Sequence, residues 1–162
     1  MNKKNTSEKK PRVKKKTWKF FDQNPLTHSA AHYLMTIERL VQSQGYARIT
    51  DIAKELNITR GSCSISVKAL RKRRLVKEDA NKFLQLSKEG NELVQVIKRN
   101  DELLETFFKD VLQVDEWQAE IDACKIEHLV SMETSVQLAK FIDVLGADPT
   151  LSKKIRDLIQ KK

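Results

Sequence analysis

The segment CKIEH brings together three side chains that commonly bind metals: the thiol of Cys124, the carboxyl of Glu127 and the imidazole of His128. In a helix, positions i, i+3 and i+4 share one face, so these side chains would converge within one turn. A mixture of sulfur, oxygen and nitrogen ligands indicates a regulatory transition-metal site. The spacing also fits a buried cysteine in a helix interface, beside a partly exposed acid and histidine that bind nothing.

The remaining histidines of the chain favour the metal site. The sequence has three histidines, and the other two, His28 and His32, stand four residues apart, with Met35 three residues further on. Apolar residues recur with helical spacing over 28–41 and Gly45 follows, which predicts one amphipathic helix carrying all three side chains. A metal held between this helix and the CKIEH segment would connect two distant parts of the chain.

Other uses of these residue types fit less well. The sequence has no CxxC pair for structural zinc and no HExxH pair for a metalloprotease. Cys124 and His128 would share one helix turn, and no oxyanion loop or glycine-rich phosphate cradle accompanies them. We therefore do not expect an enzyme.

Between the two candidate ligand segments the sequence predicts a winged helix-turn-helix. Thr50 can cap a short helix over 51–57, and Thr59 can cap a second helix over 60–73. Two short runs with strand character, LVKE and FLQL, then flank the polar turn DANK, which predicts a small β-hairpin wing.

The second of these helices has the composition of a DNA-reading helix. Residues 60–77 carry seven basic residues and no acid. Short polar side chains can reach base edges while lysine and arginine hold phosphates, and glycine allows close backbone approach. A winged-helix module that binds protein is the alternative. The residues expected to contact DNA are Thr59, Arg60, Gly61, Ser62, Ser64 and Lys68.

Helical patterns dominate the rest of the chain. A long helix is expected from Ser87 to about residue 111, followed by helices near 116–131 and 133–145 and a short amphipathic helix after GADP. Four glycines and three prolines are too few for an all-β fold. We expect a mainly α protein with a DNA-binding domain over 25–90 and an all-α dimerisation and metal-binding domain over 91–162.

Charge and composition limit the partners and the compartment. The net charge is +9, and residues 1–19 carry +8 of it, nine basic residues against one acid. Residues 1–24 are therefore expected to form a basic, disordered arm. We find no long apolar segment and no signal peptide, so no membrane partner is expected. Two cysteines without an export signal indicate a cytoplasmic protein with free thiols.

The combined pattern resembles the diphtheria-toxin-repressor family, which includes iron-dependent repressors and manganese-transport regulators. The resemblance covers about residues 27–145. GYARITDIA is similar to the manganese branch, whereas Cys-x-x-Glu-His is similar to the iron branch. The segments that carry it are HYLMTIERL, GYARITDIAKELNITRGSCSISVKALRKRRLV, LQLSKEG, NDELLETFF and CKIEHLVS.

The resemblance implies two metal positions. The first would use residues of the first helix together with those of CKIEH, which are His32, Met35, Cys124, Glu127 and His128. A second position would use Asp101, Glu105 and Glu120. The family commonly has methionine or aspartate where His32 stands, and histidines where Asp101 and Glu120 stand, so the identity of the metal does not transfer. About 17 residues follow Leu145, which implies the short form without an SH3-like domain.

These observations predict a homodimeric, divalent-metal-dependent transcriptional regulator that binds double-stranded operator DNA and represses metal-uptake genes. The expected corepressor is Fe²⁺ or Mn²⁺, and the softness of sulfur and imidazole favours Fe²⁺. The alternative is a winged-helix regulator or adaptor without a metal site, which would respond to an organic ligand or a protein partner.

Overall fold

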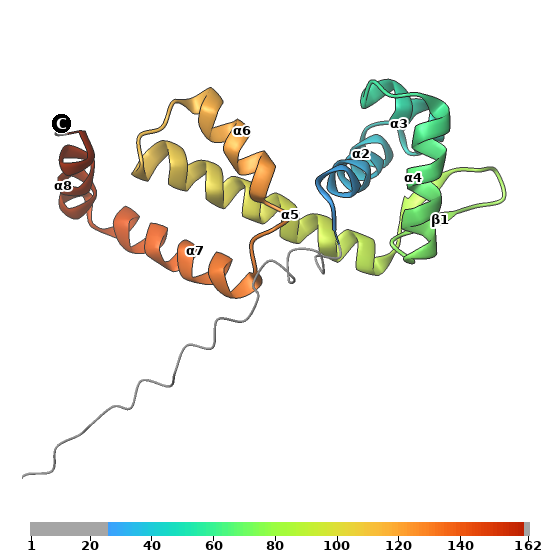
Figure 1. Cartoon of the computed structure of the whole chain (residues 1–162). Coiled ribbons are helices and arrows are strands. Elements are labelled where there is room, and N and C mark those ends of the chain that lie inside the picture. The colour runs from blue at the N-terminus through green and yellow to red at the C-terminus, as the bar shows by residue number, and fades with distance from the viewer. Residues whose placement is uncertain (1–25, 161–162) are drawn as a thin grey trace, which may run out of the picture.

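The computed structural model describes residues 26–160. The arm expected over 1–24 lies outside the described residues. An N-terminal head and a helical half lie at opposite ends of one long helix (Figure 1). The head consists of α2 (His28–Gln44), α3 (Ile49–Glu55), α4 (Arg60–Lys72), β1 (Val76–Glu78) and β2 (Leu84–Leu86).

Local signals define the ends of the head helices. The Thr27 side chain accepts a hydrogen bond from the backbone N–H of Ala30 at 3.2 Å, and Gly45, with φ of 82°, ends α2 in the left-handed conformation that favours glycine. Thr59 caps α4 as expected. The prediction for Thr50 is wrong, because α3 begins two residues earlier, at Ile49, and its N-cap Arg48 makes no side-chain capping bond.

The wing is the antiparallel pair of β1 and β2, in which Val76 lies opposite Leu86. A further bridge from Ala47 to Leu84 attaches the hairpin to the segment between α2 and α3. This confirms the winged helix-turn-helix. The head core is continuous from the helices into the hairpin, and its largest fully buried aliphatic side chains include Leu34, Ile37, Ile52, Leu84 and Ile97.

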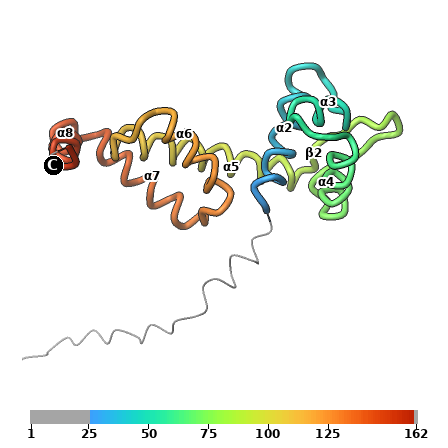
Figure 2. Tube along the Cα trace, turned by 45° about the horizontal axis from the view of Figure 1, so that its top comes forward, coloured from blue at the N-terminus to red at the C-terminus, as the bar shows by residue number. Residues whose placement is uncertain are grey.

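The long helix α5 (Lys88–Thr106) connects the head to the helical half (Figure 2). Ser87 caps it, and Gly90 lets its first turn approach the head, since a Cβ at this position would lie 2.1 Å from the carbonyl oxygen of Leu75. The predicted extension to residue 111 is wrong in detail, because the last turn, Phe107–Val111, is a π-helix.

The helical half confirms the all-α prediction with different boundaries. The helix expected over 116–131 ends five residues earlier, and the next helix begins at Met132. Among the described residues no helix has the length and apolar character needed to cross a membrane. The three helices of this half are α6 (Glu116–Ile126), α7 (Met132–Ala147) and α8 (Pro149–Gln160).

Candidate functional site

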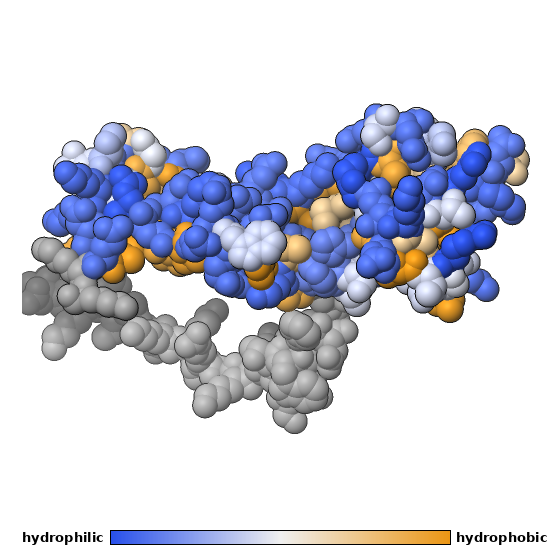
Figure 3. Space-filling view, turned by 90° about the horizontal axis from the view of Figure 1, so that it is seen from above, coloured by the Kyte–Doolittle hydropathy of each residue, from blue (hydrophilic) through white to orange (hydrophobic). Residues whose placement is uncertain are grey.

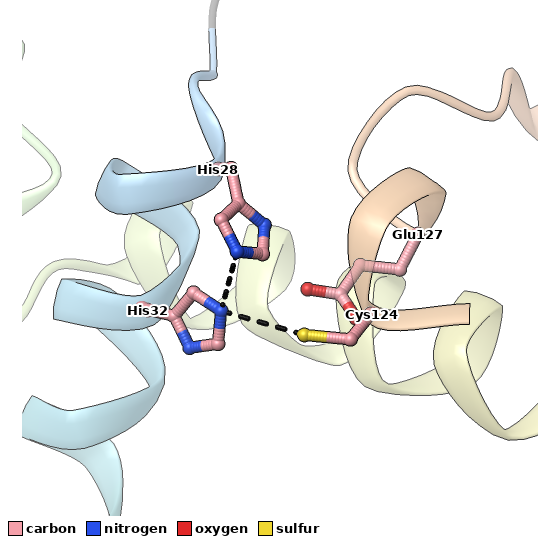
Figure 4. Close-up of side chains that lie close together, drawn as sticks. All are labelled: His28, His32, Cys124 and Glu127. Atoms are coloured by element: carbon pink, nitrogen blue, oxygen red, sulfur yellow. Dashed lines mark hydrogen bonds between the residues drawn. The ribbon is translucent and has the colours of Figure 1, made fainter. Parts of the chain in front are cut away.

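Four side chains from two helices meet between the head and the helical half. His28 and His32 project from α2, and Cys124 projects from α6, with Glu127 as the residue that caps α6 (Figure 4). One ligand atom from each of the four lies within 4.8 Å of the corresponding atoms of the other three. Two imidazoles, a thiol and a carboxyl thus face one small volume.

The contacts between these atoms are close. His32 Nε2 lies 3.0 Å from His28 Nε2 and 3.5 Å from Cys124 Sγ. Glu127 is buried, and its Oε1 atom has no hydrogen-bond partner within the described part of the chain. A buried carboxylate oxygen without a donor is costly unless a cation or a proton satisfies it. The donor set and this oxygen therefore fit a divalent transition metal.

The ionisation of the site in the absence of metal follows from burial. Burial and, after it, the neighbouring carboxylate of Asp101 together raise the pKa of Glu127 to about 8. Burial is also the main reason that the pKa of Asp101 is raised and that the pKa of the Cys124 thiol is raised. Burial, and then the charge of His28, lower the pKa of His32. Metal binding would offset the cost of burying charged groups here, because a cation would replace the protons on these side chains.

Polar contacts to α5 hold the α2 side of the site in place. Glu38 lies on the same helix as the two histidines and is largely buried. It forms an ion pair with Lys98 and accepts a hydrogen bond of 2.8 Å from Gln95, both on α5. The position of α2 relative to α5 is therefore set by a specific buried carboxylate as well as by the apolar core.

A buried hydrogen-bond network holds the α6 side. Asn100 of α5 donates from its amide nitrogen to the backbone oxygen of Glu127 at 2.8 Å. The hydroxyl of Ser135 on α7 donates to the amide oxygen of Asn100 at 2.7 Å. Both side chains are buried, so this network fixes the turn that carries Glu127 with respect to α5 and α7.

The remaining predicted ligands lie beside the four-residue cluster. The ring centroid of His128 lies 5.3 Å from that of His28, so His128 flanks the site. Burial, and then the charges of His28 and His32, lower the pKa of His128. Met35 is half-buried and packs against the head core. The ligand roles of His128 and Met35 stay predictions.

The residues expected at a second metal position are only partly brought together. Asp101 hydrogen-bonds with Glu127, and the charge of Glu120 raises the pKa of both Asp101 and Cys124, so these acids adjoin the first site. The charge of Glu105 acts on Lys109, one turn further along. A second site built from Asp101, Glu105 and Glu120 stays a prediction.

The expected DNA-reading surface is exposed on α4. All six residues predicted to contact DNA are accessible, whereas Val67 and Leu70 on the opposite face are buried. A groove of about 1330 Å³ runs between the end of α4, β1 and the start of α5. Its basic lining residues are Lys68, Arg71, Lys72, Arg73, Arg74 and Lys77.

The sequence does not predict the roles of two residues in the site. The sequence pairs His28 with His32 on one helix face, but it contains no further signal that makes His28 a ligand. Asn100 was not singled out, because a lone asparagine in a helical pattern gives no local sign that it will be buried.

Known proteins match both parts of the chain. Residues 25–83 match the N-terminal DNA-binding domain of iron-dependent repressors, and residues 87–156 match their metal-binding and dimerisation domain. The chain is 30% identical over 129 residues to the HTH-type transcriptional regulator MntR of Lysinibacillus sphaericus, which covers 80% of this chain and 92% of that protein. It is 29% identical over 136 residues to MntR of Shouchella clausii, with 84% and 94% covered.

A solved structure of a metal-dependent regulator has a similar fold. The manganese regulator SloR superposes with a TM-score of 0.64 at 26% sequence identity. The match covers 73% of this chain but only 55% of the SloR chain.

Proposed function

Because the chain belongs to the diphtheria-toxin-repressor family of metal-dependent transcriptional regulators, we propose that it is a homodimeric repressor of metal-uptake genes. Its metal is Fe²⁺ or Mn²⁺. We propose that His32, Cys124 and Glu127 hold the metal, with His128 and Met35 as further candidate ligands. The role is regulatory rather than catalytic, and we place the protein in the cytoplasm, where operator DNA is accessible.

The observation that carries this proposal is the contact of 3.5 Å between His32 Nε2 on α2 and Cys124 Sγ on α6. These helices belong to the two matched domains. A divalent metal held by His32, Cys124 and Glu127 would connect α2 to α6, and these residues would then restrict the head relative to the helical half.

Restriction of α2 affects the reading helix because both share one core. Leu34 and Ile37 of α2 belong to the same buried cluster as Val67 and Leu70 of α4. Interiors are close-packed, so α4 must move with α2. In a dimer the separation of the two reading helices would then be set by the metal-linked angle of the heads, and it must match the spacing of half-sites on DNA.

The helical half offers an apolar surface for the second copy. Apolar side chains lie along one edge of this half (Figure 3). Such exposure is unusual for a monomer and is typical of an interface. The large hydrophobic residues exposed on α7 and α8 are Met132, Phe141, Val144, Leu151, Leu158 and Ile159.

The proposal is tested by operator binding of metal-free protein with added Fe²⁺ under anaerobic conditions or with added Mn²⁺. DNA binding should require metal and should be reversed by a chelator. Chelator-resistant, full-affinity binding would favour the regulator without a metal site.

A further inference from the structure

We propose that His28 is a fourth metal ligand, so that His28, His32, Cys124 and Glu127 form a four-donor site. This inference rests on the proposed function and names a ligand beyond the family pattern described above. It predicts that the chain favours metals that bind nitrogen and sulfur well, namely Co²⁺, Zn²⁺ and Fe²⁺, over Mn²⁺.

The closest separations approach those of a tetrahedral site, and all four ligand atoms lie within 4.8 Å of one another. With metal–nitrogen and metal–sulfur bonds of about 2.0 to 2.3 Å, neighbouring ligand atoms in a tetrahedron lie about 3.3 to 3.8 Å apart. The separation of 3.5 Å between His32 Nε2 and Cys124 Sγ falls in this range. The separation of 3.0 Å between the His28 and His32 nitrogens needs only a small rotation of one exposed ring. Glu127 Oε1 completes the set with an oxygen that lacks a donor within the described chain.

His28 lies outside the hydrophobic core of the head. It is exposed at the first position of α2, where a positively charged imidazole would oppose the helix dipole. Its ring nevertheless lies against the rings of both His32 and His128, with centroids 4.3 Å and 5.3 Å away. An imidazole at this place, with a thiol and a carboxyl oxygen within 4.8 Å of its ligand atom, is suited to bind a cation.

The donor chemistry sets the selectivity. Two imidazoles, one thiolate and one carboxylate are softer than the oxygen-rich sets that suit Mn²⁺. Without His28, a water molecule would replace one imidazole. The preference for Co²⁺, Zn²⁺ and Fe²⁺ over Mn²⁺ should then decrease. His28 would therefore determine specificity as well as affinity.

The first experiment reads the imidazoles directly in the full-length protein. Because the sequence has only three histidines, their ring nitrogens can be assigned by NMR after ¹⁵N labelling. Titration with Zn²⁺, which is diamagnetic, should shift the coordinating nitrogens of both His28 and His32. If His32 responds and His28 does not, the assignment of His28 is overturned while the proposed function stands. If no histidine responds, both fail.

The second experiment compares His28→Ala with Ser29→Ala, an exposed neighbour on the same turn. With Co²⁺, His28→Ala should keep the thiolate-to-cobalt charge-transfer band, change the d–d spectrum and lose at least about tenfold in affinity. Its affinity for Mn²⁺ should change much less. Ser29→Ala should behave as wild type. Equal Co²⁺ spectra and affinities for His28→Ala and wild type would overturn the proposal.

Discussion

His32 Nε2 lies 3.5 Å from Cys124 Sγ although 92 residues separate them in the chain. This contact joins the domain that carries the reading helix to the domain named for metal binding and dimerisation in the family. A single ion at this point can therefore bias a movement of whole domains, since it needs only to bind one arrangement better than the other.

Replacement of either residue tests the bridge. We expect Cys124→Ala and His32→Ala to abolish metal-stimulated operator binding, because each removes a donor from one side of the domain junction. Circular dichroism should remain helical. Lys125→Ala, an exposed change on the same helix, should retain metal-stimulated binding in the same gel-shift assay. Metal-stimulated binding by Cys124→Ala at wild-type metal concentrations would contradict the assigned site.

Metal binding should release protons near neutral pH. The pKa of Glu127 is raised from 4.5 to about 8, so its carboxyl is protonated at neutral pH and must lose that proton to bind metal. Affinity should rise as the pH approaches 8. Calorimetry in buffers of different ionisation enthalpy should detect fewer released protons for Glu127→Gln than for wild type. An equal number would show that Glu127 is already ionised.

The same carboxyl should make the metal-free fold less stable at higher pH. Because the pKa of Glu127 is higher in the folded than in the unfolded state, the unfolded chain loses this proton first as pH rises. The contribution of Glu127 to the free energy of unfolding should thus decrease between pH 4.5 and about 8. Urea denaturation of metal-free wild type and Glu127→Gln should show a smaller decline in the variant.

Asn100 should position the turn that carries Glu127. Asn100→Ala leaves the backbone oxygen of Glu127 and the hydroxyl of Ser135 without this buried partner, and should cost about 1 to 3 kcal/mol of unfolding free energy. Metal affinity should fall as well. Ser135→Ala removes only the second bond, so metal affinity should fall less. Equal metal affinities of Asn100→Ala and wild type would contradict a positioning role.

Replacement of Gly61 by alanine should raise the stability of the fold but lower the affinity for DNA. A Cβ at this position would meet only the side chain of Thr59, at 4.0 Å, so alanine fits. In the helix, Gly61→Ala should stabilise the protein by about 0.5 to 1 kcal/mol in thermal or urea unfolding. Operator affinity should nevertheless fall if the backbone approaches DNA closely here. Unchanged affinity would place Gly61 away from the interface.

Lys68 should act through phosphate contacts. Lys68→Ala should weaken binding to all DNA sequences and reduce the salt dependence of affinity by about one counterion unit. Lys88→Ala, an exposed lysine at the start of α5, is the control and should keep the wild-type slope. Equal slopes for Lys68→Ala and wild type would remove this lysine from the phosphate contacts.

Periodicity and capping in the sequence determined the kind and order of the elements. These elements depend on residues that are neighbours in the chain, so the sequence alone indicates them. Examples are the Thr59 cap, the helix end at Gly45 and the polar turn between two short strands. Prediction was poorer at Thr50 and after Thr106, because α3 and the π-helix Phe107–Val111 both begin without a side-chain capping bond that the sequence could indicate.

The site required the tertiary structure. Sequence spacing could put Cys124 and Glu127 on one turn, and His28 and His32 on another, because a helix has a fixed repeat. Whether the two turns meet depends on how α2 and α6 pack against α5, to which the contacts of Glu38 with Lys98 and of Asn100 with the Glu127 backbone contribute. These contacts join residues far apart in the chain, so the tertiary structure alone decided that His28 belongs to the cluster.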